Sequence, residues 1–559
     1  MVAGTRRGLL RLGTYSFAVQ SLHVVFAALF VEYYTNDFLI VEDMPKANAV
    51  SPTDIDGGRL HFSKLGLGML VAAQLMYAVC SVLHRSGAVA FSSLVAPLWR
   101  PQRVAWNEHS LAFVFGASWL ALRLPFVPSA VSFTLAMAAV GALSERCSAF
   151  AQNVMRGVAA QQPKEEESVQ LVSRAASGGA SVVVLIATLL YDGCSPRKGP
   201  LRRFHWCLFI LCGVCVCVFS VLRRWRCSFH GEEATSTARE DCCVGSRSVS
   251  GLGDGTLTDF HDFVPQTWQR RSMKALLVVR ALHRYAHTVM VSFFHLLLCL
   301  GSAPLLSAAA RAVILALVAA APSFLAPTYV ASAGLVGKKC LISLVLLGVC
   351  AVGLASLVAA FFSRGAVGVV VVAPVAVEDS AGVRSVAAVW LCALLLMLLR
   401  LLLDSLHDLL DLAQEDVVEE DAILFGRAIQ MAAWTKRLCS IVAVPMESLS
   451  RITTLLLLAF TTAVEGGALA PSTITSSGDS NRAQSTLVPQ KAAAAGTLWW
   501  TAKANMASTV LAVLSLQTCG VALAMLVVWH RYYNLEGKHL QFIQMAIRKR
   551  KDEQSVAVV

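Results

Sequence analysis

The sequence predicts an all-α membrane protein in which twelve transmembrane helices form two six-helix bundles. Two features of the composition indicate this class: 56% of the 559 residues are hydrophobic and only 15% are charged, whereas soluble proteins carry about 25% charged residues. The third observation is the length of the apolar runs, because residues 341–362 include no charged side chain and one bilayer crossing needs about 20 apolar residues. Such solid runs differ from the alternating strands of a membrane β-barrel.

The first six expected helices are apolar runs of about 20 residues or more, as a bilayer crossing requires. The third ends and the fourth begins around Pro125 and Pro128, and the acidic segment 165–167 separates the fourth from the fifth. These six helices cover about 10–33, 65–84, 109–127, 129–156, 168–191 and 203–222.

The second six expected helices follow a long polar interruption and have the same character. Lys338 and Lys339 separate the second and third of them, and the run from Ile441 to Phe460 is broken by only a few polar residues. They cover about 275–300, 308–334, 339–362, 385–411, 426–463 and 498–530.

The polar interruption at 223–273 divides the helices six and six. It contains several arginines and a Ser/Gly-rich stretch from Gly245 to Gly255, a composition that is typical of flexible linkers. We therefore expect four parts: a six-helix bundle at 1–222, a cytoplasmic linker at 223–273, a second bundle at 274–530 and a cytoplasmic tail at 531–559.

The distribution of basic residues predicts the orientation of this integral, multi-pass protein. With both termini in the cytoplasm, the inner loops carry about twice as many basic residues as the outer ones, as the positive-inside rule requires. The tail after Leu535 can form an amphipathic helix that ends in the basic run from Arg548 to Lys551. We expect it to bind anionic lipid at the cytoplasmic leaflet of the plasma membrane or of an endomembrane.

Several other functions are not expected. The 16 cysteines lie mostly within apolar runs and do not form the framework of a small secreted protein. The net charge of +12 comes from basic residues beside the spans rather than from a nucleic-acid-binding face. The sequence has no P-loop, HExxH or G-x-S-x-G motif. We therefore expect no enzyme activity, no cofactor, no metal site and no nucleic-acid partner, and we expect a monomer.

Four segments together resemble one family of transporters. They are Glu32-Tyr33-Tyr34-Thr35-Asn36-Asp37; the loop Glu165-Glu166-Glu167 with Ser177-Gly178-Gly179-Ala180-Ser181; the acidic run Asp416-Val417-Val418-Glu419-Glu420-Asp421 with Arg427; and the tail from Arg531 to Gln544. The chain resembles the melibiose-permease-like branch of the major facilitator superfamily, the glycoside–pentoside–hexuronide cation symporters, and within it the eukaryotic orphan subgroup. Two six-helix halves joined by a long central loop also match the major facilitator layout.

The resemblance implies transport of a sugar-like solute coupled to H⁺ or Na⁺, but three of the family's carboxylates are missing here. The second helix reads Cys80-Ser81-Val82-Leu83-His84-Arg85 where the family has a cation-binding acid. The family's acid in the first helix falls near Gln20, and its acid in the fourth helix falls near 148–152. Carboxylates are natural ligands for cations and for sugar hydroxyls, so the coupling ion and the solute stay open.

Polar residues within the spans are candidates for the substrate cavity, because a charge in the membrane is costly and needs a reason. We select Gln20, Arg123, Glu145, Gln152 and His295. Arg123 can instead reach toward the outer surface and Glu145 can instead form an ion pair; the cavity role of His295 stays open.

A second group of charged residues indicates a gate or a charge network. Arg400, Asp404 and Asp408 have the i, i+4, i+8 spacing that places them on one helical face. The acids continue through Asp416, Glu419, Glu420 and Asp421 to Arg427. They either form a relay that opens and closes the cytoplasmic gate, pairing with Arg427 or Lys436 on neighbouring helices, or form an ion-pair ladder that leaves the membrane.

Basic residues also open the seventh span. Arg280, His283, Arg284 and His287 are either a cavity-lining stripe or side chains that extend to the headgroups. In the eleventh span, Glu447 and Arg451 have the spacing of an intrahelical ion pair.

These observations favour a secondary transporter that moves a small polar solute by alternating access between its two halves. The alternative is a relative that has the fold but does not transport, and acts as a membrane scaffold or receptor. A polar cavity reached by solvent at the middle of the membrane favours transport, and an apolar centre favours the scaffold.

Overall fold

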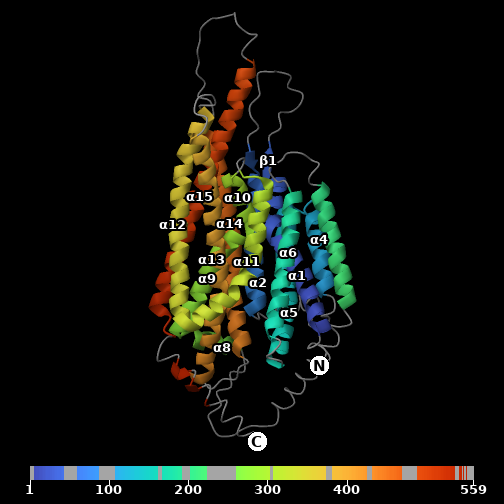
Figure 1. Cartoon of the computed structure of the whole chain (residues 1–559), viewed down its shortest axis with the longest axis vertical. Coiled ribbons are helices and arrows are strands. Elements are labelled where there is room, and N and C mark those ends of the chain that lie inside the picture. The colour runs from blue at the N-terminus through green and yellow to red at the C-terminus, as the bar shows by residue number, and fades with distance from the viewer. Residues whose placement is uncertain are drawn as a thin grey trace, which may run out of the picture.

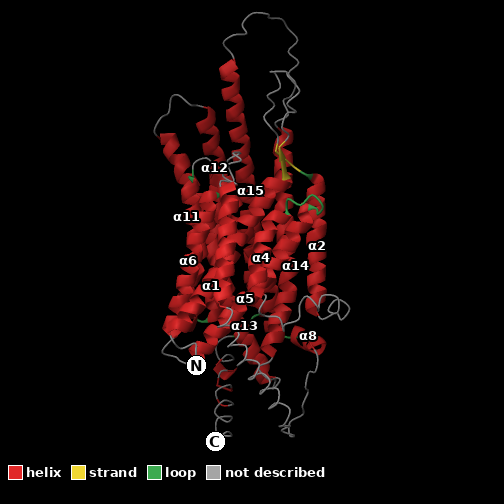
Figure 2. Cartoon of the chain, turned by 90° about the vertical axis from the view of Figure 1, so that its right-hand side faces the viewer, coloured by secondary structure: helices red, strands yellow, loops and turns green. Residues whose placement is uncertain are grey.

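The computed structural model of the chain is almost entirely helical (Figures 1 and 2). It describes residues 6–42, 60–86, 107–161, 166–191, 202–222, 260–302, 306–372, 380–424, 431–468, 488–535, 541–543, 545, 546 and 549. Two short strands pair antiparallel, with Ile40 opposite Phe62 and Glu42 opposite Leu60. The helices run side by side along the long axis of the molecule, as expected for an all-α membrane protein.

The first half of the chain supplies six long helices and the two strands. The elements are α1 (Arg6–Tyr34), the π-helical turn η1 (Thr35–Leu39), β1 (Ile40–Glu42), β2 (Leu60–Phe62), α2 (Lys64–Ser86), α4 (Asn107–Ala121), α5 (Ser129–Gln161), α6 (Glu166–Leu190) and a helix over Arg202–Leu222. The turn between α4 and α5 contains Pro125 and Pro128 and coincides with the expected boundary.

The second half begins with a short helix in the segment expected to be a linker. Its elements are α8 (Phe260–Trp268), α9 (Arg271–Ser292), α10 (Phe294–Ser302), α11 (Ala308–Val336), α12 (Lys338–Val372), α13 (Ser380–Leu424), α14 (Met431–Ala468) and α15 (Val488–Tyr532). Gly337 alone separates α11 from α12, and its φ of +91° is a conformation that glycine adopts without steric cost.

The expected seventh span is broken in the structure. Its helix stops after Ser292 and resumes at Phe294, since Phe293 has φ −113° and ψ 2°. His295 therefore lies on α10 rather than on the continuous face of α9 that its spacing from Arg280 indicates. Hydropathy cannot detect this break, because both sides of it are apolar.

The helices have the length and the surface of membrane-spanning segments. Nine of the described helices are long and apolar enough to cross a bilayer. With α4, α5 and the α9–α10 pair they give the expected twelve positions. Exposed apolar side chains such as Phe209, Leu335 and Leu347 cover their outer surfaces, an arrangement that lipid tails favour and water does not.

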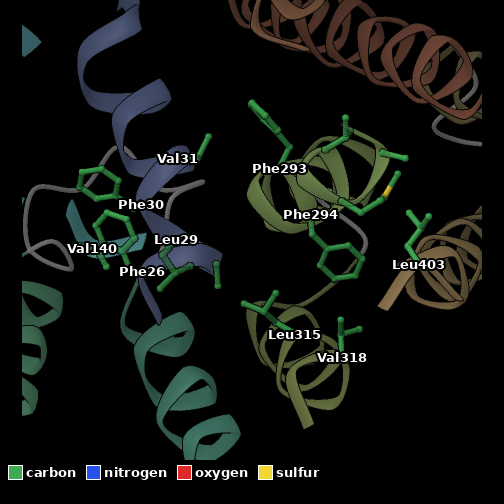
Figure 3. Packing of buried hydrophobic residues seen from close by; sticks show 14 of the residues in the cluster. Phe26, Leu29, Phe30, Val31, Val140, Phe293, Phe294, Leu315, Val318 and Leu403 are labelled. Atoms are coloured by element: carbon green, nitrogen blue, oxygen red, sulfur yellow. The ribbon is translucent and has the colours of Figure 1, made fainter. Parts of the chain in front are cut away.

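The two halves meet where α6 packs against α11, α2 packs against α14, and α1 packs against α9 and α10. Buried apolar residues of both halves form one cluster (Figure 3). On the side of the second half, Phe294 points toward Leu315 and Val318 of α11. In the first half, Phe26 and Phe30 stack with ring centroids 4.2 Å apart.

The helix bundle has two ends, which different helices reach. We call the end where α1 begins and α15 ends the terminal end, and the opposite end, near β1 and α10, the far end (Figure 1). The halves touch at both ends: Arg437 Nε donates to the Arg85 carbonyl at 2.5 Å toward the terminal end, and Glu32 contacts His295 at the far end.

Candidate functional site

A set of charged side chains on α9, α13 and α14 faces the first half. They are Arg284, His287, Arg400, Asp404, Glu447 and Arg451, and we call them, with the polar side chains of the first half that lie near them, the central cluster. Arg284 Nε donates to Glu447 Oε1 at 2.5 Å, and Arg451 lies 3.6 Å from the other oxygen of the same carboxylate. One carboxylate of α14 thus holds one arginine of α9 and one of its own helix. The Arg284 side chain is 37% exposed, so the packing of the helices does not fully enclose the cluster.

The first half adds polar groups to the central cluster from α1, α2 and α5. His23 Nδ1 shares a hydrogen bond with Ser144 Oγ at 3.0 Å, and His23 lies within electrostatic range of Arg284. Glu145 and Tyr77 also lie within electrostatic range of Arg284. The side chains of His23 and Glu145 are exposed and that of Tyr77 is half-buried. The cluster is therefore polar, partly exposed and built by both halves.

Asp404 links two further basic residues at the edge of the central cluster. His287 Nε2 lies 2.8 Å from Asp404 Oδ1, and Arg400 Nε donates to Asp404 Oδ2 at 2.8 Å. The rings of His283, His287 and His407 form a triangle whose centroids are 5.3 to 5.9 Å apart. Asp404 is buried and fully partnered, which is what a carboxylate inside a membrane protein requires.

A second set of ion pairs, which we call the charge ladder, joins α13 to other parts of the second half toward the terminal end. Arg270 pairs with Glu420 and, at 2.7 Å, with Asp421. Arg280 pairs with Asp411. Lys338 lies 2.6 Å from Asp416. All members of the ladder belong to the second half, so these pairs hold α9, its N-terminal flank, α12 and α13 together rather than bridging the halves.

The structure separates the residues expected to line the substrate cavity. Glu145 lies at the central cluster, whereas Arg123 is exposed in the turn after α4 and Gln152 is exposed on α5. Gln20 is half-buried and donates to Ser16 Oγ at 3.3 Å. His295 lies at the far end, buried against Glu32. Only one of the five thus belongs to the cluster that both halves build.

The expected gate residues divide between the two charged groups. Arg400 and Asp404 belong to the central cluster, while Asp416, Glu420 and Asp421 belong to the charge ladder. Asp408 and Glu419 are half-buried on α13. Arg427 lies outside the described residues, and Lys436 is exposed.

Several contacts in the two charged groups are not indicated by the sequence pattern. The i, i+4 pairs Arg400–Asp404 and Glu447–Arg451 are present as their spacing predicts. In contrast, Arg284 and Glu447 are 163 residues apart, and Arg270 and Asp421 are 151 apart. His23 lies in a largely apolar run, shortly after Gln20 and Ser21, and no pattern in the sequence distinguishes it from a core histidine.

One group of described residues has the composition of a metal site. Glu32, His295 and Cys299 are all buried, and their ligand atoms lie within 4.8 Å of one another.

No protein-family model and no curated protein matches this sequence. Among solved structures, a mutant form of the nucleoside transporter NupG aligns with a TM-score of 0.52 at 9% identity, covering 93% of this chain and 99% of that one. NupG itself aligns with a TM-score of 0.50 at 12% identity, covering 94% and 99%. A bacterial homologue of the human lysosomal transporter Spinster gives a lower TM-score of 0.43 at 12% identity, covering 93% and 94%.

The fold is of the major facilitator type. The alignments cover both halves of this chain and almost all of NupG. The resemblance drawn from the sequence motifs is thus confirmed for the superfamily fold, in a multi-pass membrane protein that resembles transporters. The branch within the superfamily is a separate question, because identities of 9 to 12% show the fold alone.

Proposed function

We propose that this protein is a secondary transporter that moves a small polar solute by alternating access of its two halves. One observation carries the proposal: the central cluster is polar, partly exposed and built from both halves. Arg284, Glu447 and Arg451 come from the second half, and His23 and Glu145 from the first. Charged side chains within the membrane are energetically costly, and a scaffold that binds no solute there gains nothing from them.

The chemistry of the cluster favours a solute with an anionic group. In the second half three arginines, Arg284, Arg400 and Arg451, face two carboxylates, Asp404 and Glu447. The contact between Arg451 and Glu447 is the longest of these ion pairs, at 3.6 Å. A carboxylate or phosphate of the solute is thus well placed to bind Arg451, because guanidinium groups bind both in a bidentate geometry.

The proposal includes membership of the melibiose-permease-like branch. It leaves undecided whether an ion is cotransported with the solute. The acids missing near Gln20, at 80–85 and at 148–152 have counterparts of another kind, because Glu145, Asp404 and Glu447 bring carboxylates to the centre from other positions. We favour uniport or H⁺ coupling over Na⁺ coupling, since Asp404 and Glu447 are already occupied by basic side chains and His287 can exchange a proton.

The two sets of ion pairs have different roles in the proposed cycle. The charge ladder stiffens the second half, so that this half moves as one body. The contacts between the halves, Arg437 with Arg85 and Glu32 with His295, form and break during the cycle. Such contacts bias an equilibrium between states when they exist in only one of them.

The proposal also includes the placement of the protein in its membrane. We place both termini in the cytoplasm, so that the terminal end is the cytoplasmic end, in a plasma membrane or an endomembrane. The basic tail binds anionic lipid, and the protein works as a monomer.

The test is a thermal-shift screen of the purified full chain against anionic and neutral polar metabolites, with and without Na⁺ and at two pH values. A ligand at 100 times its Kd adds about 2.7 kcal/mol of stability. We expect an anionic metabolite to raise the melting temperature of the protein, and we expect the variant Arg451→Gln to abolish this increase. The matched control is Arg270→Gln, which removes a buried arginine of the ladder and is expected to preserve the response. A folded protein that responds to no metabolite indicates the non-transporting scaffold instead.

A further inference from the structure

Three buried side chains at the far end bring together the donor types that transition metals prefer. Glu32 lies in the last turn of α1, and His295 and Cys299 lie on α10. The side chains of Glu32 and His295 are 2% and 3% exposed. The three ligand atoms lie within 4.8 Å of one another. The group thus joins the two halves of the molecule at a dry position.

The break between α9 and α10 gives this group its geometry. α10 begins anew at Phe294, and His295 and Cys299 follow at i, i+4, so that they lie one turn apart on one face. Figure 3 shows that the neighbouring Phe294 points toward Leu315 and Val318 of α11. The apolar residue therefore anchors α10 to its own half, while the two donors face α1.

A buried carboxylate needs a positive partner, and here that charge can come from either of two sources. The Glu32 carboxylate contacts His295 Nδ1 directly, and no lysine or arginine among the described residues forms an ion pair with it. A proton on His295 makes the pair neutral. A divalent cation bound by the Glu32 carboxylate, the Cys299 thiolate and a neutral His295 also makes the site neutral, and neutrality is what an apolar interior favours.

The distances suit a zinc-like ion. Zinc binds sulfur at about 2.3 Å and nitrogen at about 2.0–2.1 Å, so a tetrahedral site places these two atoms about 3.6 Å apart. Cys299 Sγ and His295 Nδ1 are 3.8 Å apart. Glu32 Oε2, now hydrogen-bonded to Nδ1, has to move outward until the two atoms are roughly 3.4 Å apart. That is a small change for a carboxylate at a helix end.

We propose that Glu32, His295 and Cys299 bind one thiophilic divalent cation of the Zn²⁺ class, which clamps the two halves together at the far end. On binding, the thiol proton of Cys299 and the proton shared by Glu32 and His295 leave to solvent, and the metal takes their place. The clamp holds one state of the molecule, so the metal acts as a regulator rather than as a transported solute. Metal binding is independent of the proposed transport function; only the effect of the clamp on transport rests on it.

The test uses the purified full chain, stripped of metal with a chelator and titrated with Co²⁺ as a spectroscopic probe for zinc. We expect one Co²⁺ per chain, visible d–d bands of a tetrahedral ion and a near-ultraviolet sulfur-to-cobalt charge-transfer band. Zn²⁺ added afterwards removes these bands. An absent charge-transfer band, or one that Zn²⁺ does not displace, overturns the proposal and indicates that a proton alone occupies the site.

Variants assign the signal to this site. Cys299→Ser is expected to abolish the charge-transfer band and to weaken binding at least about 100-fold, because it removes a direct ligand. Cys392→Ser removes another buried cysteine, on α13, and is expected to leave the spectrum unchanged. If Cys299→Ser does not fold, Cys299→His keeps a ligand without sulfur and is expected to retain d–d bands but lose the charge-transfer band. A charge-transfer band that survives either Cys299 substitution contradicts the assignment.

Discussion

Glu447 holds Arg284 of α9 and Arg451 of its own helix α14. Its side chain is only 16% exposed and that of Arg451 only 9%, so this pair is largely removed from water. Losing one partner of a buried ion pair costs more than the pair itself contributes, because the remaining charge stays unpaired. Among the residues that the second half contributes to the central cluster, Glu447 is therefore the one whose loss leaves the most charge unpaired.

Glu447→Gln is expected to lower the free energy of unfolding by about 3 kcal/mol or more, because it leaves two arginines without their shared anion. Chemical denaturation of the detergent-purified protein measures the change. The double variant Glu447→Gln with Arg284→Gln is expected to recover part of the loss. A double variant that is less stable than the sum of both single changes contradicts this account of the cluster.

At the scale of single helices, α13 has a graded row of acids. The Asp411 side chain is 60% exposed, although it pairs with Arg280, whereas Asp416 is 4% exposed and pairs with Lys338. Exposed ion pairs contribute about 0–1 kcal/mol, and buried ones cost several kcal/mol when one partner is lost. The same residue type on one helix thus has two different energetic roles.

Asp411→Asn is expected to lower stability by less than about 1 kcal/mol, and Asp416→Asn by clearly more, about 2 kcal/mol or above, because Lys338 loses its buried anion. The two denaturation midpoints, measured side by side, give the comparison. Equal losses of stability in the two variants would contradict the claim that burial decides how much each ion pair of the charge ladder contributes.

The packing of α6 against α1 gives a second prediction at this scale. A Cβ atom added to Gly179 would lie 2.9 Å from the Phe17 ring, closer than side chains pack, whereas a Cβ atom added to Gly141 would have no neighbouring atom within 4 Å. Gly179→Ala is expected to cost about 1–3 kcal/mol. Gly141→Ala in the middle of α5 is expected to stabilise by up to about 1 kcal/mol, because alanine favours the helix. Thermal denaturation of both variants checks the opposite signs.

At the scale of the whole molecule, hydropathy predicts the twelve spans and the i, i+4 spacing predicts two ion pairs. Contacts between distant segments are not predicted. Glu32 and His295 are 263 residues apart, and their contact lies beside a helix break that no proline or glycine marks. Within the central cluster, the sequence pattern indicates Glu145 but not His23, because a histidine in an apolar run looks the same whether it is buried or exposed.

The packing of α6 against α11 offers a lock across the halves. Ser323 Oγ donates to Ser177 Oγ at 2.8 Å, so cysteines at both positions bring two sulfurs close to disulfide range. The double variant Ser177→Cys with Ser323→Cys is expected to lose solute uptake into proteoliposomes under oxidising conditions and to regain it on reduction. Each single variant is the control and is expected to transport in both conditions. Uptake that persists in the oxidised double variant, with the disulfide verified by mass spectrometry, contradicts rigid-body movement of the halves at this interface.

The most direct test of the central claim is whether both sides of the membrane reach the central cluster. In sealed vesicles of each orientation, the variant His23→Cys is treated with a membrane-impermeant maleimide, and modification at position 23 is quantified by mass spectrometry. Alternating access predicts modification from both sides, and modification from one side only once the α6–α11 disulfide has formed. Modification from one side only in the unlocked protein, or from neither side, contradicts the claim that the halves alternate around this cluster.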